Sequence, residues 1–423
     1  MRPHPALTKT LVVILRKVRT VAIITLSTIL LFECTYRVIL RLAPSLLTME
    51  NAQGGLDYAD TRRVSGFGPG GGLKENFDAM VTGPYGKMVH WKNNAQGFRN
   101  DYDVTLEPGS RVVRVLSLGD SFTAGYRLAQ NETYSYLLEQ YFNSKSDDHK
   151  YEVLVSAADN PTDALDYLNQ AGLSFKPNLV LLGLTLGNDP AGTYARLAPG
   201  GKYKLDDNTG KLELNASPTL GFAHGLEKMS LPAACTHPSR MRFFENHSIS
   251  YYLLRELWRK GRKGERIATW YGTADLKLFD PAQGLGLYLN DPPDEVKQSY
   301  NDLFRTLRAI KKVTANNGVD LAVVIFSQRF QVQDEDWSCT VADYHLNDGC
   351  FDLNLPNRLI KDFCVQNDFF CIDPSGAMVA AHGNSRESLY CPQGDMHLNA
   401  GGNRVVFEAI KDQIQRRLLL ASN

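Results

Sequence analysis

From residue 111 onward, short apolar segments alternate with stretches whose hydrophobic residues recur at helical spacing. Strands are expected at residues 112–118, 153–155, 179–184, 321–326 and 369–372. Strands that are apolar along their whole length are typical of parallel sheets covered on both faces, and each parallel crossover needs a dozen or more residues. The pattern therefore predicts an α/β chain, with any functional site at the carboxyl ends of the strands.

Together, the expected strands and helices predict a flavodoxin-like, three-layer α/β/α fold with a five-stranded, mainly parallel sheet. The clearest helix opens with Asp-Pro-Pro at 291–293, carries apolar residues at three- and four-residue spacing, and stops at Gly318. An insertion at about 191–290 separates the third strand from the fourth. Within it, residues 203–214 are expected to form a hairpin around an Asn-Thr-Gly turn.

The N-terminus differs in kind from the rest of the chain. Residues 20–32 are apolar or hydroxylated, and Glu33 is the only charge within 20–36. We predict a transmembrane anchor at 20–40 after a cytoplasmic tail at 1–19, with a cleaved signal peptide as the alternative. Because basic residues precede this segment, the positive-inside rule places the remainder outside the cytosol, on the periplasmic or extracellular side.

Residues 41–110 are predicted to be a linker and N-terminal extension, and residues 111–423 to form the α/β domain. A glycine-rich run at 66–72 invites comparison with a phosphate-binding loop. No apolar strand precedes this run, no helical pattern follows it at once, and Pro69 removes one amide donor. A linker is therefore favoured.

The charge balance bears on possible partners. The chain has 46 Lys and Arg residues against 46 Asp and Glu residues, so it lacks the basic character that binding to a phosphate backbone requires. A local basic stretch at 255–266 is expected to be a solvated helix end, with contact to anionic lipid or glycan as the alternative. Nucleic acid is not an expected partner.

Cysteine usage agrees with an exported domain. Cys34 falls in the predicted anchor, which leaves an even number of cysteines in the remainder. Disulfides are therefore expected, with free buried thiols as the alternative. Sequence leaves the pairing open, and the preferred pairs are the local ones, Cys364 with Cys371 and Cys339 with Cys350.

A candidate nucleophile follows the first strand directly. The segment Gly-Asp-Ser-Phe-Thr-Ala-Gly at 119–125 places Ser121 in a strand-to-helix turn at the carboxyl edge of the sheet, where a nucleophile is well exposed. The alternative is a serine that only caps a helix. Near the C-terminus, Asp395 and His397 precede a predicted helix at 405–419. His397 could take the serine proton, and Asp395 could hold its tautomer and stabilise the imidazolium.

A third candidate follows the third strand, again at the carboxyl edge. In the Gly-Asn-Asp segment at 187–189, the Asn188 amide and the backbone N–H of Ser121 could together donate to a developing oxyanion. The alternative is an Asn-Asp turn. Although His397 alone would be explained as an ordinary satisfied histidine, the serine and the Asp-x-His pair lie at opposite ends of one α/β unit, which favours a catalytic site.

Together these residues resemble the SGNH/GDSL hydrolase superfamily, and more narrowly its membrane-anchored bacterial members, which are often linked to surface polysaccharides. The resemblance covers about residues 92–419 without the insertion, and is carried by Asn-Ala-Gln-Gly-Phe-Arg at 94–99, by the segments at 119–125 and 187–189, and by Asp395-x-His397-x-Asn399. It implies that Ser121, His397 and Asp395 form a catalytic triad.

The resemblance also implies an oxyanion hole made by Ser121, Asn188 and a further backbone N–H. In that third place the family usually has glycine, whereas this chain has Asn160 in the segment Ala-Asp-Asn-Pro at 158–161. Any residue except proline has an N–H to offer, but a non-glycine residue is restricted in backbone conformation.

These features predict an extracytoplasmic serine esterase that cleaves acyl esters, with O-acetyl groups on cell-envelope glycans as the preferred substrate implied by the resemblance. The alternatives are an O-acyltransferase that passes the acyl group to a polysaccharide, and a glycan-binding scaffold without activity. No cofactor is implied. No metal site is predicted either, because the sequence lacks His-x-x-x-His and paired Cys-x-x-Cys spacings. The oligomeric state stays open.

Overall fold

The structure is a computed structural model that describes residues 5–42, 72–82, 88–218, 231–236, 284–391 and 395–421. Helix α1 (Pro5–Leu42) belongs to one compact unit, and the other described residues belong to a second. Within the described residues, no helix is both long enough and apolar enough to cross a membrane. The structure therefore gives no support to the transmembrane anchor predicted at 20–40.

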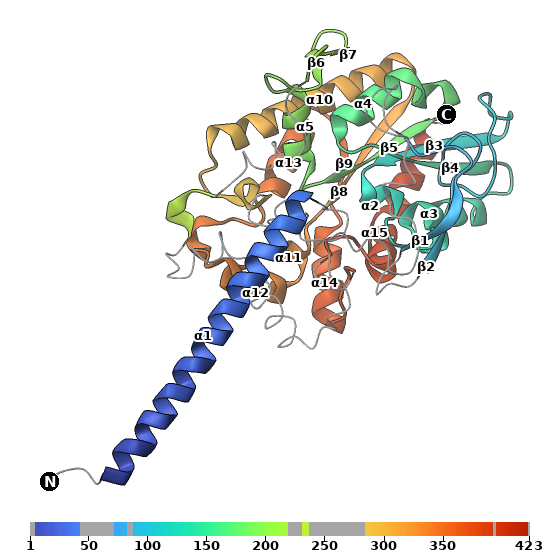
Figure 1. The fold of residues 1–423 in the computed structure, drawn as a ribbon. Coiled ribbons are helices and arrows are strands. Elements are labelled where there is room, and N and C mark those ends of the chain that lie inside the picture. Colours follow the sequence, from blue (N-terminus) through green and yellow to red (C-terminus); the bar gives the residue numbers. More distant parts are fainter. Residues whose placement is uncertain are drawn as a thin grey trace. The chain divides into compact units, whose positions relative to one another are not determined.

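The second unit is built on a five-stranded sheet with the order β4-β3-β5-β8-β9 (Figure 1). Every pairing in this sheet is parallel. Numbered along the chain, the order is 2-1-3-4-5, which is the flavodoxin-like, doubly wound arrangement. The predicted α/β class is confirmed. The strands are β3 (Val112–Gly119), β4 (Lys150–Ala157), β5 (Leu179–Thr185), β8 (Asp320–Phe326) and β9 (Phe370–Ile372).

Successive strand residues face opposite layers, because side chains alternate across a sheet. Leu116 and Leu182 join one hydrophobic core, whereas their neighbours Val115 and Leu181 join another. The first core includes residues of α4 (Pro161–Gln170), α5 (Asp189–Leu197), α10 (Asp294–Asn316) and α13 (Leu355–Gln366). The second includes residues of α3 (Tyr134–Ser144), α14 (Ser375–Ser385) and α15 (Ala400–Ala421). Helices thus cover both faces of the sheet (Figure 1).

Part of the N-terminal extension is a hairpin, although the sequence predicted only a linker and extension there. Strands β1 (Asp78–Thr82) and β2 (Met88–Lys92) pair antiparallel. Phe77 and Trp91 pack in a small cluster with Ala124 and Ala157, which lie just beyond β3 and at the end of β4. The extension therefore contacts the carboxyl edge of the sheet. Of the glycine-rich run, residues 66–71 lie outside the described residues.

The insertion is described only in part. Its first residues belong to α5, which contacts α10 in the helical layer. The predicted hairpin is confirmed as β6 (Tyr203–Asp206) and β7 (Lys211–Leu214). The basic stretch at 255–266 lies outside the described residues.

The remaining short helices of the described residues are α2 (Ser121–Ala124), η4 (Gln130–Glu132), η5 (Gly172–Phe175), η6 (Ala233–Cys235), η7 (Leu285–Tyr288), α11 (Arg329–Val332), α12 (Asp334–Tyr344) and η8 (Asp348–Cys350).

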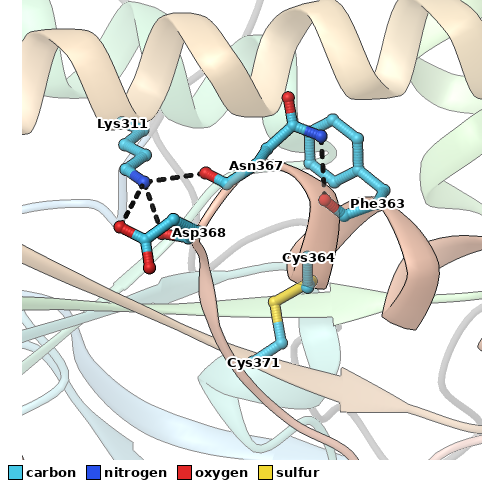
Figure 2. The surroundings of a disulfide bond; sticks show 6 residues. All are labelled: Lys311, Phe363, Cys364, Asn367, Asp368 and Cys371. Carbon is cyan, nitrogen blue, oxygen red and sulfur yellow. Dashed lines mark hydrogen bonds and ion pairs between the residues drawn. A yellow bond between two sulfur atoms is a disulfide. The ribbon is translucent and has the colours of Figure 1, made fainter.

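One of the two predicted disulfides is present. Cys364 of α13 is bonded to Cys371 of β9, beside a turn whose carbonyl oxygens accept hydrogen bonds from Lys311 of α10 (Figure 2). The predicted partner of Cys339 was wrong, since Cys350 is bonded to Cys235 instead.

Tertiary contacts explain why Cys235 pairs with Cys350. Thr236 forms an antiparallel bridge with Leu346, and the N–H of Asn347 donates to the carbonyl of Cys235 at 2.9 Å. These contacts bring a segment of the insertion alongside residues 346–350. Cys339, on α12, is a half-buried free thiol.

Candidate active site

The serine candidate sits where β3 gives way to α2. Strand β3 is buried almost throughout, and α2 begins at Ser121 directly after its end. Asp120 caps this helix by accepting a hydrogen bond from the N–H of Phe122 at 2.9 Å. Gly119 has no room for a side chain, because a Cβ there would lie 2.4 Å from Oγ1 of Thr123. The tight strand-to-helix turn therefore leaves Ser121 at the carboxyl edge of the sheet.

The structure brings Ser121 and His397 together although 276 positions separate them. Ser121 Oγ lies 2.7 Å from His397 Nε2, and His397 Nδ1 lies 2.6 Å from Oδ1 of Asp395. A carboxylate can only accept, so Nδ1 carries the proton and the lone pair of Nε2 faces the serine hydroxyl. This is the tautomer that a general base for serine requires.

The carboxylate of Asp395 is held in its ionised form. Burial alone would raise its pKa, but hydrogen bonding to His397 and the positive charge of Arg127 outweigh burial and lower the pKa below its ordinary value. The Asp395 side chain is 11% exposed. Asp395 also accepts a hydrogen bond from the backbone N–H of His397 at 2.9 Å. A charged acceptor is thus fixed behind the imidazole.

Two aromatic rings contact the imidazole of His397. The ring of Phe122 lies 5.2 Å away between centroids, and the ring of Tyr126 meets the imidazole edge-on at 4.6 Å. Both come from the segment that carries Ser121. These contacts limit rotation of the base and shield one part of it from water.

The expected oxyanion donors lie at the ends of neighbouring strands. Asn188 follows β5, and its Nδ2 donates to Oδ2 of Asp120 at 2.9 Å, which leaves the second amide hydrogen for another acceptor. Asn160 follows β4 and caps α4. In the part of the chain that the structure describes, the backbone N–H groups of Ser121 and Asn160 make no hydrogen bond. A backbone N–H without a partner in the protein can donate to a bound ligand, so both groups are available as oxyanion donors.

The asparagine in the usual place of glycine is accommodated without strain. Asn160 has φ −164° and ψ 170°, which is extended backbone that any residue adopts. Its side chain accepts hydrogen bonds from the N–H groups of Thr162 and Asp163, at 3.0 and 3.2 Å. Asn160 therefore fixes the start of α4 through its side chain and leaves its own N–H free.

A buried polar cluster beneath the serine was not anticipated from sequence. Oδ1 of Asp120 accepts from the hydroxyl of Thr185 at 3.1 Å, and Oδ2 of Asp189 accepts from the N–H of Thr185 at 2.6 Å. Burial and the nearby charge of Asp120 raise the pKa of Asp189 well above its ordinary value. The only sequence signal was that both acids flank residues already singled out, Ser121 and Asn188.

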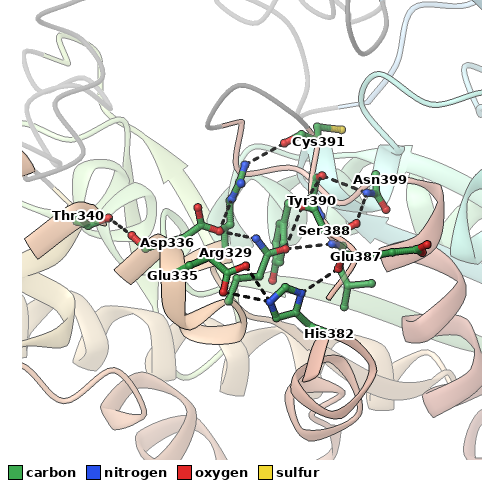
Figure 3. Close-up of polar contacts among 12 residues, drawn as sticks. Arg329, Glu335, Asp336, Thr340, His382, Glu387, Ser388, Tyr390, Cys391 and Asn399 are labelled. Carbon is green, nitrogen blue, oxygen red and sulfur yellow. Dashed lines mark hydrogen bonds and ion pairs between the residues drawn. The ribbon is translucent and has the colours of Figure 1, made fainter. Parts of the chain in front are cut away.

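The segment at 387–391 supports the loop that carries His397, and Figure 3 shows the contacts of this segment with Asn399 and Arg329. The N–H of Cys391 donates to the carbonyl of His397 at 2.7 Å, and Asn399 donates through Nδ2 to the carbonyl of Ser388 at 2.6 Å. Arg329 donates to the carbonyl of Cys391 at 3.1 Å. Burial raises the pKa of the Cys391 thiol to about 12, so this cysteine stays protonated and is no rival nucleophile.

Among the described residues, one group of side chains has donor atoms close enough to hold a metal ion. It consists of Asp334, Glu335 and His382. His382 is buried, with Nδ1 2.9 Å from the carbonyl of Glu387 and Nε2 3.0 Å from Glu335 Oε1 (Figure 3). Both ring nitrogens thus face acceptors, and a doubly protonated imidazolium satisfies them without a metal.

Fold and geometry together define a class of protein. It has a doubly wound parallel sheet, and a Ser–His–Asp hydrogen-bonded chain stands where the strand order reverses, between β3 and β5, the usual place for a site in such sheets. No protein-family model matches the sequence, and no curated protein does.

Several solved structures are similar to this chain at low identity. One is an acetyl xylan esterase, with TM-score 0.36 and 13% identity, covering 71% of this chain and 100% of the other. Another is a catalytic mutant of an acetylxylan esterase from Geobacillus stearothermophilus, with TM-score 0.35, 9% identity and coverage of 71% and 94%. A third is a GDSL-like lipase from Bacteroides thetaiotaomicron, with TM-score 0.33, 10% identity and coverage of 72% and 88%.

Proposed function

We propose that this protein is a serine esterase that cleaves acyl esters through an acyl-enzyme on Ser121. The single observation that carries the proposal is the hydrogen-bonded chain from Ser121 through His397 to Asp395, at 2.7 and 2.6 Å, with the base in the required tautomer. A serine that only caps a helix would not need a histidine on its hydroxyl, nor a buried carboxylate behind that histidine.

The chemistry is determined by the positions of these groups. His397 takes the hydroxyl proton through Nε2 as Ser121 Oγ bonds to the acyl carbon, and Asp395 stabilises the imidazolium. The carbonyl oxygen becomes an oxyanion that the N–H groups of Ser121 and Asn160 and the amide of Asn188 stabilise. His397 then gives its proton to the departing alcohol. A water molecule, deprotonated by His397, then attacks the acyl carbon, and His397 gives that proton to Ser121 Oγ as the carboxylic acid leaves.

The substrate class we propose is an O-acetyl or similar ester on a cell-envelope glycan. This substrate class is supported by the motif resemblance to bacterial members of the superfamily that are linked to surface polysaccharides. It does not rest on any residue of a substrate pocket. Acyl transfer to a sugar hydroxyl would use the same acyl-enzyme, with an alcohol in place of water. Adding candidate glycan acceptors to the assay separates the two, because transfer yields an acylated acceptor whereas hydrolysis yields free acid.

We also propose that the domain works outside the cytosol. Its two disulfides support this, because such bonds persist in oxidising compartments and are rare in the cytosol. The basic residues that precede residue 20 are consistent with export of the rest of the chain.

The decisive experiment combines labelling with mutation. A fluorophosphonate should label the wild type, and Ser121→Ala should abolish both labelling and cleavage of an activated acetyl ester. His397→Ala should lose activity to a similar degree, and the double mutant should be scarcely worse, because members of one catalytic unit are strongly non-additive. Undiminished turnover in folded Ser121→Ala would refute the proposal. A wild type that is neither labelled nor active would favour the binding scaffold.

A further inference from the structure

Arg127 lies just beyond the helix that begins with Ser121. Gly125 ends α2 in a left-handed conformation, and Arg127 has φ +64°. Glycine suits this region of backbone space, whereas an arginine there is disfavoured. A non-glycine residue kept in such a conformation near a candidate active site is grounds for asking what its side chain does.

The guanidinium group of Arg127 forms an ion pair with the candidate catalytic acid. Nε lies 3.1 Å from Oδ2 of Asp395, and each of the two side chains is 11% exposed. The other oxygen of Asp395 accepts from both the ring and the backbone of His397. The two oxygens are therefore divided, one toward the base and one toward Arg127.

The same segment also contacts the base directly. The guanidinium of Arg127 lies 5.1 Å from the centroid of the Tyr126 ring, and that ring meets the His397 imidazole. Residues 125–127 thus link the serine helix to both the acid and the base, which come from a distant part of the chain.

We propose that Arg127 is a positioning residue for the triad, holding the Asp395 carboxylate in line with His397 and offsetting part of its negative charge. This rests on the proposed function, in which Asp395 and His397 serve Ser121. The attraction between the guanidinium and the outer oxygen opposes rotation of the carboxylate away from the imidazole.

Two substitutions separate charge from geometry. Arg127→Met removes the charge and keeps much of the length, whereas Arg127→Lys keeps the charge and loses the planar fork. Arg416→Met is the matched control, because Arg416 is an exposed arginine on α15. Each full-length protein is assayed for kcat and KM, and the Nδ1 proton of His397 is followed by NMR, because its chemical shift reports the hydrogen bond to Asp395.

For Arg127→Met we expect kcat to fall about 10- to 100-fold, the range found when outer groups that orient metal ligands are removed, with KM nearly unchanged. The Nδ1 proton signal of His397 should move upfield or broaden, because the Asp395 carboxylate is no longer held against the imidazole. Arg127→Lys should keep this signal in place with a smaller loss of kcat. Arg416→Met should match the wild type in both.

An Arg127→Met protein with the wild-type Nδ1 proton signal would overturn the inference, because the hydrogen bond between His397 and Asp395 would then form without Arg127. A rise in KM alone would overturn it too, since it would make Arg127 a substrate contact. If the wild type shows no turnover, the proposed function fails. The NMR measurement then still decides on Arg127, because a displaced Nδ1 proton signal in Arg127→Met supports the inference and an unchanged signal refutes it.

Discussion

Replacing Asn188 by alanine probes the oxyanion hole, and the structure shows that this change has two effects. The Asn188 amide has one hydrogen on Asp120 and one available to a substrate. Loss of one oxyanion donor in a well-studied protease costs about 10²- to 10³-fold in kcat. We expect a fall of that size in Asn188→Ala, with KM little changed, because the donor acts mainly on charge that develops in the transition state.

The second effect is on stability. The Asp120 carboxylate is 5% exposed and accepts the Asn188 amide at 2.9 Å. A hydrogen bond to a charged group contributes about 1.5–3 kcal/mol, so Asn188→Ala should lower the free energy of unfolding by roughly that amount. Because this loss could itself disturb the serine helix, a control with the same structural defect is needed.

Thr185→Val supplies that control. It removes the hydroxyl that donates to the other oxygen of Asp120 at 3.1 Å, and it keeps nearly the same shape. The stability loss should be similar, about 1–3 kcal/mol, whereas kcat should change only a few-fold. Denaturant unfolding and ester kinetics measure the two effects separately. Equal losses of kcat in the two variants would refute an oxyanion role for Asn188, because Asn188 would then act only through Asp120.

Two further predictions concern stability and compartment. Burial lowers the pKa of His382, but hydrogen bonds to Glu387 and Glu335 outweigh it and raise the pKa above its ordinary value. Its stabilisation is therefore full below about pH 6.5 and is lost as pH rises through the folded-state value, so His382→Gln should cost about 1.5–3 kcal/mol of unfolding free energy in acid and little in alkali. A gap that widens with pH would contradict this. Alkylation without reductant, followed by mass spectrometry, should leave Cys235, Cys350, Cys364 and Cys371 unmodified in protein from its native compartment. Labelled Cys364 and Cys371 would contradict the extracytoplasmic location.

Local patterns in the sequence were enough for the sheet and for the residues of the hydrogen-bonded chain. Strands β3, β5 and β8 are continuous apolar runs, and α10 carries a regular stripe between its start and stop signals. Ser121 could be placed because it follows a strand directly, and parallel strands end at one edge. The Cys364–Cys371 bond was also foreseeable, since only 7 positions separate the two residues.

Composition and proximity in sequence were weaker guides. The anchor at 20–40 was inferred from a run of uncharged residues, and no described helix is long and apolar enough to support it. The Cys339–Cys350 pair was preferred for its short separation, whereas the observed Cys235–Cys350 bond spans 115 positions. Strand β1 was missed because only its packing with Trp91 of β2 and with the sheet edge makes it a strand.

The sequence by itself determined which residue types stand at the ends of which strands, because hydrophobic periodicity and turn chemistry are local properties. Only the tertiary structure decided which of them meet. The 2.7 Å contact between Ser121 and His397, the hydrogen bonds from Thr185 and Asn188 to Asp120, and the ion pair between Arg127 and Asp395 all depend on segments far apart in the chain. No local pattern encodes such contacts, because they form only when the layers pack and bring the strand ends to one edge.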